Sequence, residues 1–133
     1  MSHAHLRLFV LALLLVCAGG LASQDARTAR SSDAQLAGAP ANAAARKNPF
    51  EGRPDAVRAG QKLFQRHCAG CHGQDARGKG KAPDLHSPVV QNASPGALSW
   101  FLKNGNLKAG MPSWSRLPDQ RLWQILAYLK TLD

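Results

Sequence analysis

Acidic residues are scarce in this sequence, which carries 8 Asp and Glu against 17 Lys and Arg over 133 residues, a net charge of +9. The longest apolar core, from Leu8 to Val16, falls short of the ~20 residues that a membrane-spanning helix needs. No segment shows the alternation of apolar and polar residues that indicates a half-buried strand. These absences argue against a β fold and against stable membrane insertion, and the basic charge favours acidic partners.

Residues 1–22 have the pattern of an export signal, with Arg7 before the apolar core and small residues after it. Gly20 and Ala22 predict cleavage before Ser23, and therefore a periplasmic protein. Cleavage leaves 16 basic and 8 acidic residues, a net charge of +8. Two alternatives stay open: an uncleaved N-terminal anchor, and lipidation of Cys17, although the preceding Val16 is larger than a lipidation box prefers.

Residues 23–49 are rich in Ala, Ser, Asn, Gln and Arg and show no apolar period. Such a segment cannot bury enough surface to offset its loss of conformational entropy, so we predict a flexible tether. The folded domain then spans residues 50–133. A core of that size is marginal by itself, and a large apolar cofactor would add the buried surface that it lacks.

Three segments of this domain carry helical signals, and the fold class that they predict is all-α with long loops. The first is expected to place Val57, Gly60, Phe64 and Cys68 on one face. The second stops at Asn104–Gly105, and the third continues to the end of the chain. The predicted helices start at Pro54–Asp55, at Ser94–Pro95 and at Pro118–Asp119, where an N-terminal proline suits the first turn.

Cysteine is also scarce, since only Cys68 and Cys71 remain once the signal is removed. A disulfide between residues three apart closes almost no loop, so a structural role for the pair is weak. Zinc would need two more ligands, and the chain offers only the improvised set of Cys68, Cys71, His72 and His86. A redox dithiol is expected at the start of a helix that follows a strand, whereas this pair follows a helix.

The sequence Cys68-Ala-Gly-Cys71-His72 is the attachment signature of a c-type haem. Two thiols one helical turn apart suit thioether bonds to two vinyl groups on one edge of a porphyrin, and the adjacent histidine suits the iron below it. Met111 is the one methionine after residue 22, and it lies in a glycine-flanked loop before Pro112. This position favours Met111 as the second axial ligand, whose thioether raises the potential relative to bis-histidine ligation. The alternative is that Met111 is an apolar residue that fills a gap in the core.

The sequence resembles the class I bacterial cytochromes c, which carry one haem with His/Met ligation, over residues 52–132. The resemblance rests on AGQKLFQRHCAGCHG, KAPDLH, FLKNGNLKAGMPSW and QILAYLK. It implies one covalent haem c, bound through Cys68 and Cys71 with His72 and Met111 as metal ligands. It further implies that the carbonyl of Pro83 accepts a hydrogen bond from the imidazole. It also implies that the first helix crosses the last through Gly60 and Phe64 against Ile125 and Tyr128.

Four other residues are considered for roles at the haem. His67 and His86 are expected at the surface rather than on the iron. Trp100 suits the core as well as it suits a haem propionate. Lys108 is a hypothetical replacement for Met111 at alkaline pH.

Ligands on both faces of the iron leave no site for a substrate, so we expect a monomeric one-electron carrier and no enzyme. Basic residues near the haem motif and the methionine would steer redox partners with acidic docking surfaces, and no nucleic-acid motif is present. A haem c subunit of a periplasmic dehydrogenase or oxidase complex, such as a quinoprotein alcohol dehydrogenase, is the alternative. An open-site haem enzyme or sensor would require that Met111 does not bind.

Overall fold

The computed structural model of the protein describes residues 26–27 and 30–132. The predicted export signal and Cys17 lie outside these residues. The described part is helical, and it contains two isolated β-bridges but no strand. A helix over residues 30–37 comes first. It is followed by α2 (Ala41–Ala44), α3 (Pro54–His67), α4 (Ala69–His72), α5 (Pro88–Asn92), α6 (Pro95–Asn104), the 3-10 turn η1 (Leu107–Ala109) and α7 (Asp119–Leu129).

The three predicted helices correspond to α3, α6 and α7, and the all-α fold class is confirmed. Local signals set their starts: Pro54 occupies the first turn of α3, and the hydroxyl of Ser94 accepts a hydrogen bond from Ala97 N at the start of α6. The end of α7 differs from the prediction, since the helix stops at Leu129. Just after this end, the ammonium of Lys130 donates to the carbonyl of Gln91 in α5 and to that of Ala93, which follows α5.

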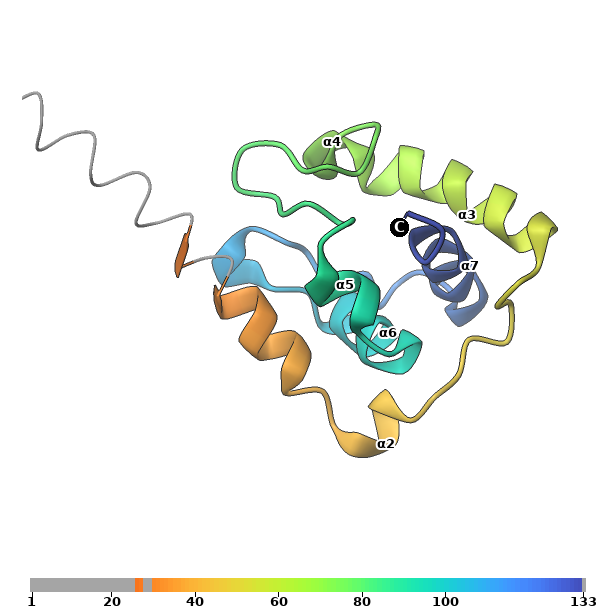
Figure 1. Ribbon diagram of the computed structural model, residues 1–133, viewed down its shortest axis with the longest axis horizontal. Coiled ribbons are helices and arrows are strands. Elements are labelled where there is room, and N and C mark those ends of the chain that lie inside the picture. The colour runs from red at the N-terminus through yellow and green to blue at the C-terminus, as the bar shows by residue number, and fades with distance from the viewer. Residues whose placement is uncertain (1–25, 28–29, 133) are drawn as a thin grey trace, which may run out of the picture.

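The core lies where α3 crosses α7 (Figure 1). A Cβ at Gly60 would come within 1.9 Å of the carbonyl oxygen of Gln124, so only glycine permits this approach of the two backbones. One turn later, the rings of Phe64 and Tyr128 lie 5.4 Å apart with their planes tilted by 52°. Because α3 is fixed here, the residues that follow it are fixed over the face of α7 that carries Ile125.

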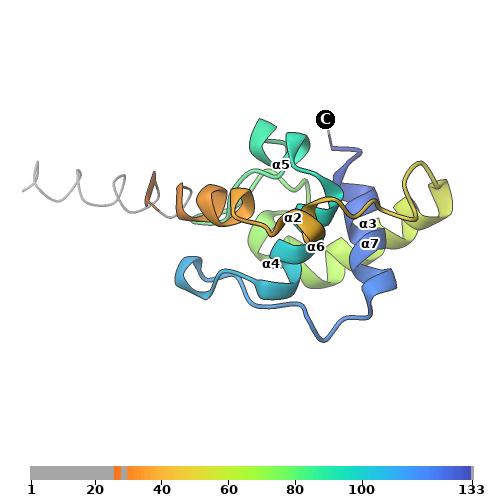
Figure 2. The same cartoon turned by 90° about the horizontal axis from the view of Figure 1, so that it is seen from below.

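Residues 30–49 differ from the flexible tether that composition predicts. Both views place α2 next to α6 (Figures 1 and 2). The hydroxyl of Ser94 donates to Ala44 O at 2.8 Å, and a Cβ at Gly96 would lie 2.1 Å from Ala43 O. The Asn48 amide donates to Trp123 O at 2.9 Å. The segment is held by backbone carbonyls and close backbone packing, which composition and apolar period do not report.

None of the helices in the described residues is long and apolar enough to cross a bilayer.

We expect Gly60→Ala to destabilise the protein by about 1–3 kcal/mol, because the added methyl forces α3 and α7 apart. The free energy of unfolding in denaturant measures this. Gly70→Ala is the matched control, since a Cβ there meets nothing within 4 Å. Equal stability of the two variants would contradict the close crossing.

Candidate functional site

A cavity of about 520 Å³ opens between the C-terminal end of α3 and the loop that follows α6. Its volume lies in the range of roughly 300–1,000 Å³ that small-molecule and cofactor sites occupy. Most of its lining is apolar, with α5, α6 and α7 supplying much of the wall. All five site residues predicted from the sequence line it: Cys68, Cys71, His72, Pro83 and Met111.

The two cysteines lie on one tight turn at the mouth of this cavity. Cys68 ends α3 and begins α4, and its carbonyl accepts hydrogen bonds from Cys71 N at 3.1 Å and His72 N at 2.9 Å. Both thiols are free, with Cys68 half-buried and Cys71 exposed. Burial raises the pKa of the Cys68 thiol to about 11, and repulsion from Cys71 adds to it. A redox dithiol needs a thiol of lowered pKa, so this environment does not suit that alternative.

The zinc set weighed from the sequence is not assembled. His86 Nε2 lies 2.9 Å from the carbonyl oxygen of Asp75, and the His86 amide donates to Asp84 Oδ1. Within the described part of the chain, no group of three or more His, Cys, Asp or Glu side chains is placed to hold a metal ion.

The ring of His72 is held in one orientation by the chain. Its Nδ1 lies 3.1 Å from Pro83 O. Burial lowers the pKa of His72, which the bond to Pro83 partly opposes, so the neutral ring is favoured. A carbonyl only accepts, so Nδ1 carries the proton and Nε2 keeps its lone pair. A neutral imidazole with a free Nε2 is the form that binds a metal.

A folded-back loop brings Pro83 to the histidine. Gly78 N donates to His72 O at 2.8 Å, and Leu85 N donates to Ala76 O at 2.9 Å. Gly78 has φ +87°, and a Cβ there would lie 2.5 Å from Ala82 O. The loop therefore needs glycine at this position, both for its backbone angle and for its close return.

Met111 reaches the cavity from a loop that begins where α6 ends. Asn106 and Met111 exchange two backbone hydrogen bonds of 2.8 and 2.9 Å, which close the loop around η1. The amide of Trp114 then donates to Leu102 O at 2.9 Å and returns the chain to α6. The Met111 side chain is half-buried against the core. A thioether and an imidazole thus line the same apolar cavity.

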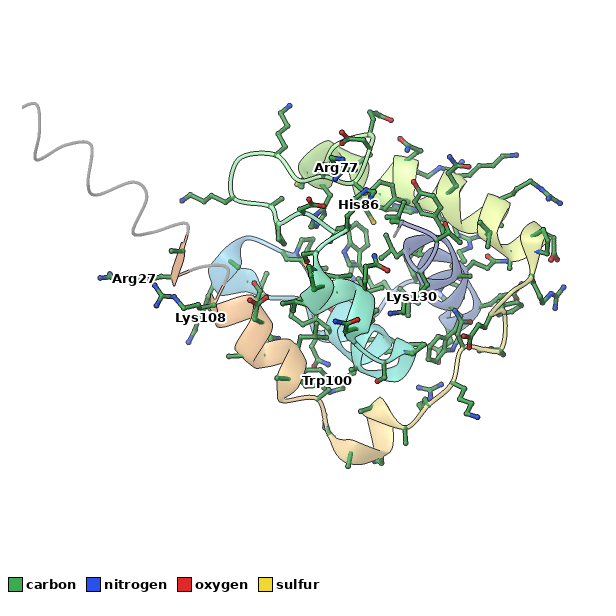
Figure 3. All side chains as sticks on the ribbon, viewed as in Figure 1. Arg27, Arg77, His86, Trp100, Lys108 and Lys130 are labelled. Atoms are coloured by element: carbon green, nitrogen blue, oxygen red, sulfur yellow. The ribbon has the colours of Figure 1, made fainter. Side chains whose placement is uncertain are left out.

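None of the residues His67, His86, Trp100 and Lys108 lines the cavity. The rings of His67 and Trp114 pack edge to face at 5.5 Å. Lys108 projects from the methionine loop, and Figure 3 also shows His86 and Trp100.

The first helix also contributes to the lining, through Ser32, Asp33 and Leu36, although the sequence predicted a flexible tether there. Leu36 could have indicated this contact from the sequence, because it is the one large apolar side chain in a segment rich in small and polar residues.

The comparisons with known proteins agree with this geometry. Residues 55–129, more than half of the chain, match the family described as cytochrome C oxidase, cbb3-type, subunit III. Cytochrome c550 of Pseudomonas aeruginosa is 29% identical over 93 residues, which cover 65% of this chain and 62% of that protein. The crystal structure of cytochrome CL from Methylophaga aminisulfidivorans superposes with a TM-score of 0.57 at 27% identity, over 64% of this chain and 58% of that one.

The chain thus spans less than two thirds of the length of either relative. The matched region nevertheless contains all of α3 except Pro54, all of α4 to α7, and every site residue predicted from the sequence. With its all-α fold built around an apolar cavity, this chain belongs to the cytochrome c family, in its cbb3-type branch.

Proposed function

We propose that the protein is an exported, periplasmic one-electron carrier with a single haem c, bound covalently through Cys68 and Cys71 and ligated by His72 and Met111. The observation that carries this proposal is that both thiols, the imidazole and the thioether line one apolar cavity. When bound, the haem supplies a one-electron ferric/ferrous couple. The chain's own residues hold it, exclude water from it and set its potential.

Each residue at the cavity fits such a group. The turn from Cys68 to Cys71 presents two thiols one helical turn apart. The bond from His72 to Pro83 leaves Nε2 available and fixes the plane of the ring. A methionine thioether favours the reduced metal and raises the potential relative to a second histidine. If His72 and Met111 both bound the iron, no position on it would remain for a substrate, and the protein would be a carrier rather than an enzyme.

Basic side chains at the rim support docking to acidic redox partners. Lys79 and Lys81 line the cavity and are exposed. Arg77, which pairs with Asp84 at 3.8 Å, lies near α4 (Figure 3). A positive field close to the point of electron exit would increase the rate of encounter with acidic proteins. Small, weak interfaces are typical of redox encounters.

A second candidate is a haem c subunit of a periplasmic oxidase or dehydrogenase complex. The matched family is named for an oxidase subunit, which favours this alternative. Purification from the native membrane and periplasmic fractions distinguishes the two: a carrier is recovered alone, whereas a subunit is recovered with a large partner.

Replacement of the second axial ligand tests the proposal. We expect Met111→Ala to abolish the methionine–ferric charge-transfer band and to lower the potential by on the order of 0.1 V, a fraction of the ~0.8 V that axial ligands span. Optical spectra and redox titration of the haem-loaded protein measure both. Leu107→Ala in the same loop is the control, since this side chain is 80% exposed and should leave both unchanged. A native protein without the band would support the open-site alternative.

A pair of glycine variants tests the role of Pro83. Gly78→Ala should displace Pro83, lower the stability by roughly 1–3 kcal/mol and change the reduction potential. Gly80→Ala carries similar backbone strain at φ +59°, but its Cβ meets nothing within 4 Å, so it should keep the native potential. If both variants shift the potential equally, the effect is not due to the contact with Pro83.

Small redox reagents test the basic rim without a known partner. Reduction of the ferric protein by hexacyanoferrate(II), an anion, should slow as ionic strength rises, and Lys79→Glu/Lys81→Glu should slow it several-fold at low salt. A cationic ruthenium hexaammine reductant should show the opposite trends. Lys47→Glu/Lys62→Glu, exposed lysines away from the cavity, changes the net charge equally and should have a smaller effect. Equal effects of the two double variants would contradict local steering.

A further inference from the structure

The helix over residues 30–37 precedes the region matched to the cytochrome c family, yet it forms part of the cavity wall. It lies beside the loop that carries Met111 (Figure 1, orange beside light blue). Leu36 is 9% exposed and belongs to the hydrophobic core. Arg27, which precedes this helix, and Lys108 of the methionine loop project at the same end of the molecule (Figure 3).

Two hydrogen bonds join this helix to the base of the methionine loop. The Gln35 side chain donates from Nε2 to Gly105 O at 2.7 Å. The Asn106 side chain donates from Nδ2 to Ser32 Oγ at 3.2 Å. Residues 32, 35 and 36 share one face of a helix, so a single face supplies both polar contacts and the apolar anchor.

Asn106 links these contacts to Met111. It is 7% exposed, its Oδ1 accepts from Ala109 N at 3.2 Å, and its backbone pairs with Met111. Gly105 is equally confined, since a Cβ there would lie 2.5 Å from the carbonyl carbon of Pro112. A displacement of either residue is therefore transmitted to Met111 through short backbone contacts.

The outer half of the loop has little to hold it. Leu107 is 80% exposed, and Lys108 and Gly110 are exposed as well. Segments with few buried contacts open at low free-energy cost. What limits opening must therefore act at the base, where the first helix makes its contacts.

We propose that Ser32 and Gln35 are positioning residues for Met111, and that the helix over residues 30–37 is a brace that keeps the methionine loop closed over the cavity. The inference rests on the proposed ligation by Met111. An external ligand binds the iron only when this loop opens, so its apparent affinity is proportional to the open fraction. The brace lowers that fraction.

Imidazole titration of the ferric, haem-loaded protein measures the open fraction, with loss of the methionine–ferric band as the signal. A net hydrogen bond is worth about a fivefold change in such an equilibrium. Because neighbouring contacts are not strictly additive, Ser32→Ala/Gln35→Ala should bind imidazole about 10- to 30-fold more tightly. Ser32→Thr, which retains a hydroxyl, should bind within about twofold of the native protein, well short of the roughly fivefold change expected for Ser32→Ala.

The matched control is Ser31→Ala/Gln61→Ala, which makes the same chemical changes at exposed positions of the first helix and of α3. It should bind imidazole as the native protein does. If Ser32→Ala/Gln35→Ala loses its haem, the two single variants provide the test, and each should bind imidazole about fivefold more tightly than the native protein.

The outcomes separate the two proposals. A native protein without the methionine–ferric band would refute ligation by Met111. If the native protein has the band but Ser32→Ala/Gln35→Ala and the control variant bind imidazole equally, the brace is overturned and ligation by Met111 is left intact. A lower thermal unfolding midpoint with unchanged imidazole affinity would also overturn it, since that is the result of a merely structural role.

Discussion

The contact between Gly60 and the backbone of Gln124 determines where the rest of the site lies. With no side chain between them, α3 and α7 approach closely enough for Phe64 to become fully buried. The end of α3 is then fixed relative to the apolar face of α7, and Cys68, Cys71 and His72 follow within two turns. A larger residue at position 60 would shift the whole attachment turn relative to the cavity that it borders.

The second constraint is the position of two loops, each shaped by glycine and by backbone hydrogen bonds. Gly78 lets one loop return so that Pro83 meets His72. At the end of α6, Gly105 lets the methionine loop start in close contact with the backbone of Pro112. Helices thus supply most of the apolar wall of the cavity, while loops bring the Pro83 carbonyl and the Met111 thioether to it. This division agrees with the common placement of functional groups on loops over a rigid scaffold.

Much of the fold could be predicted because its signals are local. Proline at the starts of α3 and α6 and glycine after α6 act within one turn. The spacing from Cys68 to His72 is likewise local, so the lining of the cavity by these residues could be anticipated. The order in residues 30–49 could not, since it depends on contacts such as Asn48 to Trp123, 75 residues away. Those contacts use backbone carbonyls, which every residue has and no composition reveals.

The first helix meets its partners only across long stretches of chain: Gln35 and Gly105 are 70 residues apart, and Ser32 and Asn106 are 74 apart. Contacts between such distant residues form late in folding, because the entropy of closing a long loop is lost before the contacts stabilise the chain. Residues 30–37 are synthesised before the region that matches the cytochrome c family. We nevertheless expect them to pack against the methionine loop only after α3, α6 and α7 have assembled. The cavity would then remain open on that side during folding, which leaves a path by which a large planar group enters before the wall is completed.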